Sequence, residues 1–223
     1  MVFKNPCMIH LFSTENNIIN NYIAELRDVD VQKDSLRFRN NLIRLGSMMG
    51  YEISKKLNYE EKEVQTPLGI ATVNVCSDKV VLGTILRAGL PLHDGLLQTF
   101  DTAENAIISA YRKHESELKF SIEVEYMSSP SLEDKILILC DPMLATGMSM
   151  VSCWKILTER RGLPKETHIV SVIASEDGFN YTKRHLPSDV NYWIGAVDPE
   201  LNAKSYIIPG LGDAGDLAYG IKL

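Results

Sequence analysis

Hydrophobic residues recur at two different spacings along this chain, a helical one first and a mixed one afterwards. Over residues 15–57 the apolar positions fall three or four residues apart, as at Ile19, Ile23 and Leu26, which predicts helices with one buried face. Two short runs, 63–68 and 70–76, are joined by a Pro-Leu-Gly sequence. They predict a β-hairpin or a strand pair.

From residue 80 onward, strand-like and helix-like runs alternate. The strand-like runs are 80–86, 106–111, 136–140, 169–174 and 190–197, and the helix-like runs are 90–100, 149–161 and 176–185. Alternation of this kind predicts an α/β fold with a mainly parallel, doubly wound sheet. Ligands of such sheets bind beyond the carboxyl ends of the strands, so we expect the chemistry just after residues 86, 111, 140 and 197.

No repeat or low-complexity segment divides the chain, so we expect one domain over residues 1–223. Its expected parts are N-terminal helices and a hairpin (1–78), the α/β core (79–200) and a C-terminal binding segment (201–223). The 223 residues are 45% hydrophobic and 23% charged, a balance that suits a globular domain of this size.

The charge and the cysteines narrow the function classes. A net charge of −6 argues against a nucleic-acid partner, because such proteins usually carry a basic excess. The four cysteines include no CxxC pair, which argues against structural zinc and against a disulfide framework. No signal peptide or membrane-spanning run is evident, so we expect a cytoplasmic protein without a membrane partner.

The segment after the buried run 136–140 has the composition of a phosphate cradle. It reads Asp141-Pro142-Met143-Leu144-Ala145-Thr146-Gly147-Met148-Ser149 and opens a helix. Small residues and hydroxyls at a helix start expose N–H donors to an anion, and Asp141 could accept hydrogen bonds from sugar hydroxyls. The lysine of a P-loop is absent, so a phosphosugar fits better than ATP.

Two arginines and a glycine-rich run extend this pattern. Arg87 and Arg112 each follow a strand-like run, where a guanidinium can hold pyrophosphate with a fork of donors. Residues 206–216 read YIIPGLGDAGD. Glycines leave backbone N–H and C=O groups accessible, so this run could read the edge of a planar base.

Together these motifs resemble uracil phosphoribosyltransferases, a branch of the type I phosphoribosyltransferase family. The DPMLATG string resembles the phosphoribosyl pyrophosphate loop, the LRAG string at 86–89 the pyrophosphate loop, and the C-terminal run the uracil-binding segment. The resemblance implies transfer of a phosphoribosyl group to uracil, giving UMP and pyrophosphate in pyrimidine salvage. It also implies a strained peptide just before Ala88 and a β-arm at residues 114–125.

The resemblance assigns residues to the substrates. Contacts to phosphoribosyl pyrophosphate fall to Arg87, Arg112, Asp141, Pro142, Met143, Leu144, Ala145, Thr146, Gly147, Met148, Ser149 and Asp213. Contacts to uracil fall to Ile207, Gly212, Asp213 and Ala214. Asp213, Arg112 and Arg87 are the candidate catalytic residues, and Asp213 is the best-placed candidate base. Mg²⁺ is expected to arrive with the pyrophosphate substrate, with no metal ligand of the protein's own. A homo-oligomer (dimer or tetramer) is expected, with GTP as a candidate effector.

Two positions depart from the family pattern. Met148 stands where the family usually has glycine, which is acceptable only if this residue is the first of a helix and has no positive φ. The TRDL-like segment that follows the N-terminal helices in the family is replaced at residues 55–65. Asp216 could cap a last short helix.

Two alternatives stay open at this point. A catalytically silent relative that senses uridine nucleotides would have lost motif residues, yet only Met148 is unusual. The same fold acting on hypoxanthine or orotate would be expected to carry paired acids where this chain has Asp141 and Pro142.

Overall fold

A computed structural model describes residues 8–116 and 119–222, and for the strand residues among 110–124 it describes the backbone only. In chain order the elements are β1 (Ile9–Leu11), the 3-10 turn η1 (Phe12–Thr14), α1 (Ile19–Arg27), α2 (Ser35–Ser54), β2 (Tyr59–Thr66), β3 (Gly69–Cys76), β4 (Val80–Leu86), α3 (Leu90–Thr99), β5 (Glu104–Ser116), β6 (Lys119–Ser128), β7 (Ile136–Cys140), β8 (Met143–Leu144), α4 (Met148–Arg161), β9 (Glu166–Ser175), α5 (Glu176–His185), β10 (Asn191–Asp198), β11 (Glu200–Leu201), β12 (Ile207–Ile208) and α6 (Ala214–Tyr219).

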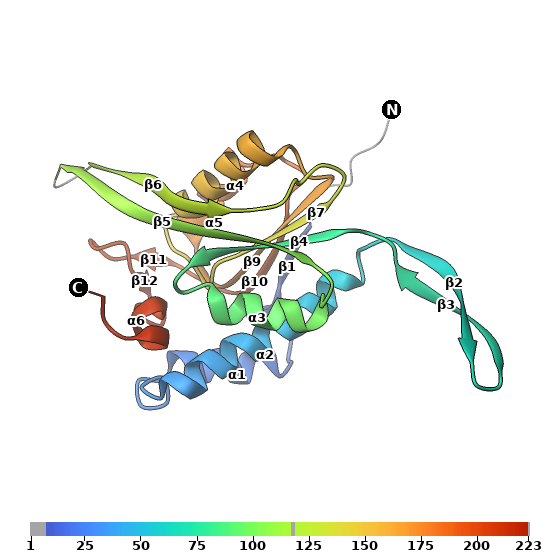
Figure 1. Cartoon of the computed structure of the whole chain (residues 1–223). Coiled ribbons are helices and arrows are strands. Elements are labelled where there is room, and N and C mark those ends of the chain that lie inside the picture. Colours follow the sequence, from blue (N-terminus) through green and yellow to red (C-terminus); the bar gives the residue numbers. More distant parts are fainter. Residues whose placement is uncertain (1–7, 117–118, 223) are drawn as a thin grey trace.

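The central sheet has the strand order β1-β10-β9-β7-β4-β5-β6, with β8 paired to β9 (Figure 1). Every pairing in it is parallel except that of β5 with β6. Helix α3 connects β4 to β5, α4 connects β7 to β9 and α5 connects β9 to β10, because a parallel pair needs a crossover connection. The mainly parallel α/β sheet predicted from the sequence is confirmed.

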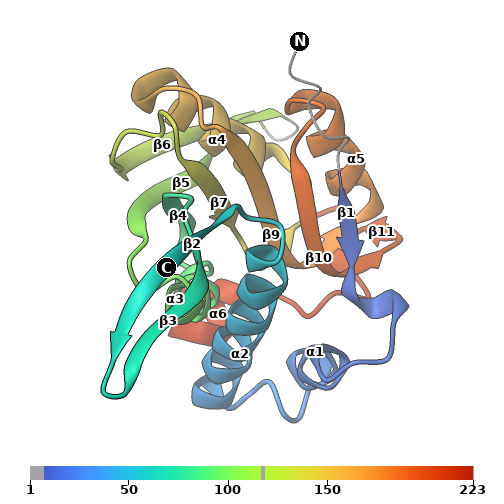
Figure 2. The same ribbon diagram turned by 90° about the vertical axis from the view of Figure 1, so that its right-hand side faces the viewer.

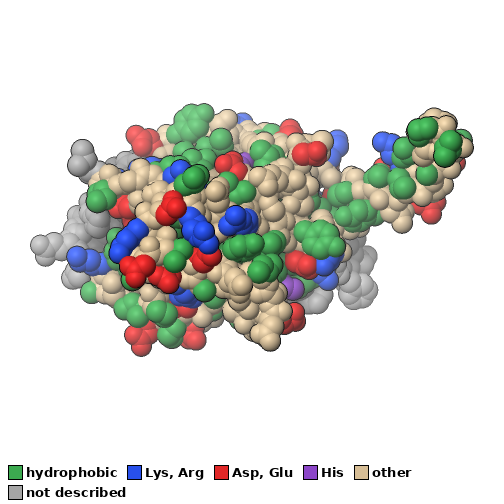
Figure 3. Space-filling model, turned by 90° about the horizontal axis from the view of Figure 1, so that it is seen from below, with side chains coloured by type: hydrophobic (Ala, Val, Ile, Leu, Met, Phe, Trp, Pro, Cys, Tyr) green, Lys and Arg blue, Asp and Glu red, His purple; other side chains and the backbone are tan. Residues whose placement is uncertain are grey.

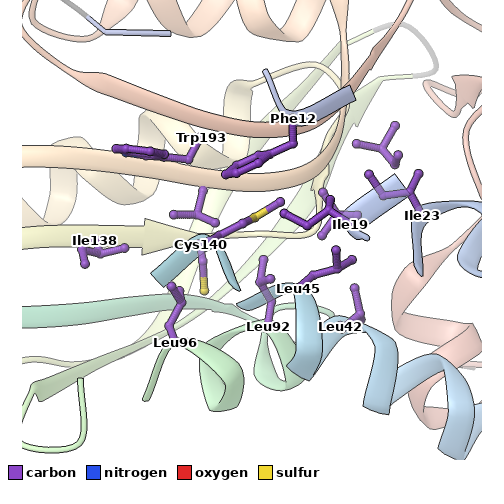
Figure 4. Close-up of a cluster of buried hydrophobic side chains, with 14 of the residues drawn as sticks. Phe12, Ile19, Ile23, Leu42, Leu45, Leu92, Leu96, Ile138, Cys140 and Trp193 are labelled. Carbon is purple, nitrogen blue, oxygen red and sulfur yellow. The ribbon is translucent and has the colours of Figure 1, made fainter. Parts of the chain in front are cut away.

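Helices cover both faces of the sheet (Figures 1 and 2). Side chains alternate in a strand, so Ile136, Ile138 and Cys140 of β7 join the core beneath α1, α2 and α3. Figure 4 shows Ile138 and Cys140 in this core. Leu137 and Leu139 point to the other face and pack with α4. A strand buried on both faces reads as an unbroken apolar run, which is why residues 136–140 were predictable.

The hairpin predicted over residues 63–76 is confirmed as β2 and β3, which pair antiparallel from Tyr59–Cys76 to Thr66–Gly69. It projects away from the sheet and its helices, and hydrophobic side chains are visible on it in Figure 3. Leu68 at its tip is 100% exposed, and Ile70 is 66% exposed. A two-stranded hairpin alone is only marginally stable in water.

The strand β1 was not predicted; it pairs with β10 through only three residues. Three residues are too few to display a strand period. Among the described residues, no helix has both the length and the apolar character that a membrane span requires.

Candidate active site

The loop after β7 is held in place by the backbone of the neighbouring strand and helix. The N–H of Asp141 donates to the Val170 carbonyl (3.1 Å), and the carbonyl of Pro142 accepts from Val172 and Ile173. The Ser175 hydroxyl then donates to the Ala145 carbonyl at 2.5 Å. The loop is thus fixed to β9 along most of its length, and α4 begins directly after it.

Two glycines make that close fit possible. Gly147 has a φ of +74°, and a Cβ there would lie 2.6 Å from the Gly178 carbonyl. A Cβ on Gly178 would in turn lie 2.1 Å from the Ala145 carbonyl. The first turn of α5 and the loop after β7 therefore touch backbone to backbone, a contact that any side chain at Gly178 would disturb.

Met148 is the first residue of α4, and the residue with positive φ is Gly147 before it. The interpretation of Met148 as a helix-start residue is confirmed. The first N–H groups of a helix have no partner within the helix. With the helix dipole they favour an anion at this end, beside the hydroxyls of Thr146 and Ser149.

Asp141 is the first residue after β7, and it is partly buried. Burial raises the pKa of Asp141 to about 7, although the N–H of Met143 donates to its Oδ1 (3.1 Å) and acts in the opposite direction. Within the described residues the N–H of Met143 is the one donor to this carboxylate, so its remaining lone pairs can accept further hydrogen bonds.

The C-terminal segment forms a narrow turn before α6. Gly210 and Gly212 have φ values of +57° and +95°, and the peptide bond between Ile208 and Pro209 is cis. The strands β11 and β12 pair antiparallel just upstream. Glycine adopts positive φ angles without strain, and its lack of a side chain leaves the backbone of the turn accessible near residue 212.

Asp213 caps α6: its Oδ1 accepts from the N–H of Asp216 at 3.0 Å. The prediction that Asp216 caps this helix is wrong, because Asp216 is its third residue and lies within the first turn. Burial by itself would raise the pKa of Asp213. The hydrogen bonds from the Asp216 N–H and from Lys222 outweigh it, and the pKa is held below its ordinary value. Asp213 is therefore ionised at neutral pH.

Arg87 follows β4, and its Nη2 donates to Asp216 Oδ1 and to the Gly220 carbonyl, both at 3.1 Å. The guanidinium thus links the end of β4 to the C-terminal turn. The peptide bond between Leu86 and Arg87 is cis, one bond earlier than the unusual peptide expected before Ala88. Arg112 lies on β5 with its backbone paired to Ile122, and its side chain lies outside the described residues.

The loop after β7 and the C-terminal turn face each other across a cavity of about 190 Å³. The predicted residues on its wall are Asp141, Met143, Ala145, Ser149, Ile207, Gly212, Asp213 and Ala214. A smaller hollow beside it is lined by Leu144, Thr146 and Gly147, together with some of the same loop residues. Pro142 and Met148 line neither space: Pro142 is buried against β9, and Met148 opens α4.

Several residues at the site were not predicted. Ala88, Ser205, Tyr206 and Gly215 also line the cavity. The Nζ of Lys222 lies 3.2 Å from Asp213 Oδ2. A lysine in an exposed tail carries no local signal, since its partner is set by how the turn folds back.

A larger cavity of about 570 Å³ lies at the opposite, amino-terminal edge of the sheet, lined by Asp78, Lys79 and Lys135 among others. Its ion pairs are satisfied internally, Lys165 with Asp78 at 2.7 Å and Lys135 with Glu104. Ligands of parallel sheets bind at the carboxyl edge, so the smaller cavity is the candidate active site. Within the described residues, no group of three acidic, histidine or cysteine side chains could hold a metal ion.

Comparison with known proteins agrees with this geometry. The family model for uracil phosphoribosyltransferase matches residues 13–221. A uracil phosphoribosyltransferase of Porphyromonas gingivalis is 52% identical over 216 residues, covering 97% of this chain and 99% of that one. The solved structure of the AQ2163 protein from Aquifex aeolicus is 32% identical, covers 97% of this chain and 100% of that one, and superposes with a TM-score of 0.85. A hypoxanthine phosphoribosyltransferase of Staphylococcus aureus is 15% identical, covers 83% of each chain and has a TM-score of 0.51, which shows the fold alone. This chain belongs to the uracil phosphoribosyltransferase family.

Proposed function

We propose that this chain transfers the phosphoribosyl group of phosphoribosyl pyrophosphate to uracil, forming UMP and releasing pyrophosphate. The observation that carries the proposal is the cavity of about 190 Å³ with an anion-binding loop on one wall and a glycine-rich turn on the other. A phosphosugar needs the first wall and a planar base needs the second. Residues of both walls line the same cavity, as one nucleotide site requires.

The roles divide along these two walls. Thr146, Gly147 and Ser149 hold the 5-phosphate at the start of α4, and Asp141 accepts from the ribose hydroxyls. Met143, Leu144 and Ala145 line the loop, while Pro142 and Met148 support it. On the other wall Ile207, Gly212, Asp213 and Ala214 hold uracil through backbone groups and apolar contact.

The reaction is a displacement at the anomeric carbon. The bond from this carbon to the pyrophosphate oxygen breaks, and a bond to the uracil ring nitrogen forms on the opposite face. Arg87 and Arg112 offset the charge that grows on the pyrophosphate, so the catalytic contribution is mostly positioning and electrostatic stabilisation. For Arg87 this requires exchange of its contacts with Asp216 and Gly220 for contacts with pyrophosphate.

Asp213 serves this reaction better by orienting groups than by removing a proton. Its lowered pKa makes the carboxylate a weak base, because bonds from the Asp216 N–H and from Lys222 already stabilise its charge. Asp213 therefore acts by holding the turn and its backbone donors toward uracil. The proton on the ring nitrogen leaves to solvent or pyrophosphate.

Mg²⁺ enters as part of the substrate, bound to pyrophosphate, where it neutralises charge on the leaving group. The wall of the cavity offers carboxylates from Asp141 and Asp213, which can hydrogen-bond the water around such an ion. These two groups fit a transient, hydrated ion.

The chain acts as one domain and as a homo-oligomer, a dimer or a tetramer. The support is the β2–β3 hairpin, which projects from the body and exposes Leu68 and Ile70. An apolar hairpin of this kind is stabilised when a second copy covers it. The action of GTP as an effector stays a prediction.

The experiment is UMP formation from uracil and phosphoribosyl pyrophosphate with Mg²⁺, run in parallel with cytosine, hypoxanthine and orotate. Turnover with uracil alone is the expected result. Turnover with another base and not with uracil would mean that the enzyme's substrate is that other base. Binding of UMP without turnover of any base would favour a silent nucleotide sensor. Light scattering of the purified protein tests the oligomer.

A further inference from the structure

A buried ion pair outside the cavity holds the turn that faces it. Arg27, the last residue of α1, donates from Nη1 to Asp198 Oδ2 (2.7 Å) and from Nη2 to Asp198 Oδ1 (2.8 Å). Asp198 is the last residue of β10. Its side chain is only 7% exposed and that of Arg27 is 24% exposed. The two residues are 171 positions apart in the chain.

The same pair binds both backbone groups of Gly210. The Gly210 N–H donates to Asp198 Oδ2 at 2.9 Å, and the Gly210 carbonyl accepts from Arg27 Nη1 at 2.9 Å. An arginine fork can make these contacts at once because its donors are fixed in one plane. A bidentate pair of this kind fixes orientation as well as distance.

Gly210 fixes the conformation of the C-terminal turn before α6, which is the proposed base-binding turn. It follows the cis peptide of Pro209, has a φ of +57°, and lies between Ile207 and Gly212. Both of these neighbours line the cavity, whereas Arg27, Asp198 and Gly210 do not. A Cβ at position 210 would lie 2.2 Å from the Ile207 carbonyl, so the turn is packed tightly here.

We propose that Arg27 and Asp198 are positioning residues that hold Gly210 and thereby align the backbone of the base-binding turn with uracil. They act on the base and not on the phosphosugar, because the loop after β7 is held by β9 and α5 instead. The inference rests on the proposed function for the identity of the base.

The chain offers a control in a second bidentate ion pair, which joins α1 to α2. Arg37 of α2 donates from Nε and Nη2 to Glu25 of α1, at 3.0 and 2.6 Å. This pair joins two helices and has no bond to residues 206–216. Arg37→Met therefore breaks a bidentate ion pair of similar geometry but greater exposure, and leaves the base-binding turn alone.

The test compares Arg27→Met, Arg27→Lys, Asp198→Asn and Arg37→Met by steady-state kinetics. In Arg27→Met we expect the KM for uracil to rise about 10–100-fold, the size of effect that a misplacement of about 1 Å can have. The KM for phosphoribosyl pyrophosphate should change less than about twofold. Arg27→Lys keeps the charge but loses the fork, so its effect should be intermediate. Arg37→Met should leave both constants unchanged.

A binding measurement on the same variants separates positioning from general damage. By calorimetry, Arg27→Met should weaken the binding of UMP by the factor seen in the KM for uracil. Ribose 5-phosphate should bind to this variant as it does to the wild type. An unchanged KM for uracil in folded Arg27→Met would overturn the proposal, and so would an equal loss for both ligands. If Arg27→Met does not fold, Arg27→Lys and Asp198→Asn decide by the same criteria. If the wild type binds UMP but makes none, the proposed activity fails while the binding comparison still tests the positioning role.

Discussion

The two walls of the cavity are built in different ways. The loop after β7 is a continuous stretch whose carbonyls and N–H groups bond to the adjacent β9, and whose glycine fits against α5. The C-terminal turn and α6 are held by charged side chains. Arg27 with Asp198 and Arg87 with Asp216 join distant parts of the chain, whereas Lys222 and Asp213 are nine residues apart.

Because of this difference, substitutions should affect the two walls in different ways. Backbone packing tolerates no added volume. The loop after β7 should therefore lose its binding geometry when one of these glycines is replaced by a residue with a side chain. Ion pairs that hold a turn can be weakened one at a time, so the base-binding turn should change by degrees. Substitutions on the first wall should change use of phosphoribosyl pyrophosphate, and those on the second should change use of uracil.

The largest expected effect comes from breaking the phosphate loop. In Gly178→Ala the new Cβ would lie 2.1 Å from the Ala145 carbonyl, so the loop must move. We expect kcat/KM for phosphoribosyl pyrophosphate to fall at least about 10²-fold, as a displacement of about 1 Å can cause. Steady-state kinetics measures this. Gly69→Ala is the control, since nothing lies within 4 Å of a Cβ at that position.

A substitution in β5 should lower the rate without favouring either substrate. Arg112→Ala should reduce kcat by about 10²–10³-fold, the usual loss when one aligned donor to a developing charge is removed. The melting temperature should stay at the wild-type value. A variant with near-full activity would remove Arg112 from the site.

Asp213→Asn distinguishes an orienting group from a general base. Asparagine also caps helices well, so the turn is retained while the charge opposite Lys222 is lost. We expect kcat to fall about tenfold or less, with the same pH–rate profile between pH 5 and 8, because the lowered pKa keeps Asp213 ionised throughout that range. A loss nearer to the 10²–10⁴-fold of a missing base, with a changed profile, would contradict this.

The smallest effect is on stability and depends on pH. The folded pKa of Asp141 is raised to about 7 by burial, so the folded state binds the proton more tightly than the unfolded chain does. Stability from this group therefore falls as pH rises from about 4, its unfolded pKa, to about 7, and is then constant. Asp141→Asn lacks this loss. Without ligands it should melt at least about 3 °C above the wild type at pH 8, the shift that about 1 kcal/mol gives in a chain of this size.

The same variant should melt with the wild type near pH 3, below the unfolded pKa, where Asp141 is largely protonated in both states. Differential scanning calorimetry at both pH values checks the prediction. An equal difference at the two values would mean that the substitution acts through packing and not through the buried charge.

Prediction from the sequence succeeded where structure depends on neighbours in the chain. The run 136–140 is buried on both faces, and the loop after it carries its own conformational signals in Gly147 and the helix start. The C-terminal run was recognisable by its glycines, but what holds it was not. Arg27 and Asp198 meet only in the folded state, and Lys222 reaches Asp213 only after the tail turns back.

The misassigned cap of α6 has the same origin. Asp213 and Asp216 are both carboxylates near a helix start, and composition does not say which of them precedes the first turn. The preceding glycine, with φ +95° at Gly212, places the start of the helix one turn earlier than expected.

The short strand β1 has a consequence for aggregation. Its residues Ile9–Leu11 pair with β10, and without them the N–H and C=O groups on that side of Tyr192, Trp193 and Ile194 would be open. An unprotected apolar edge of a sheet is a template for pairing with another chain. Removing the first eleven residues would leave the cavity untouched, yet the shortened protein should precipitate or form fibres on storage.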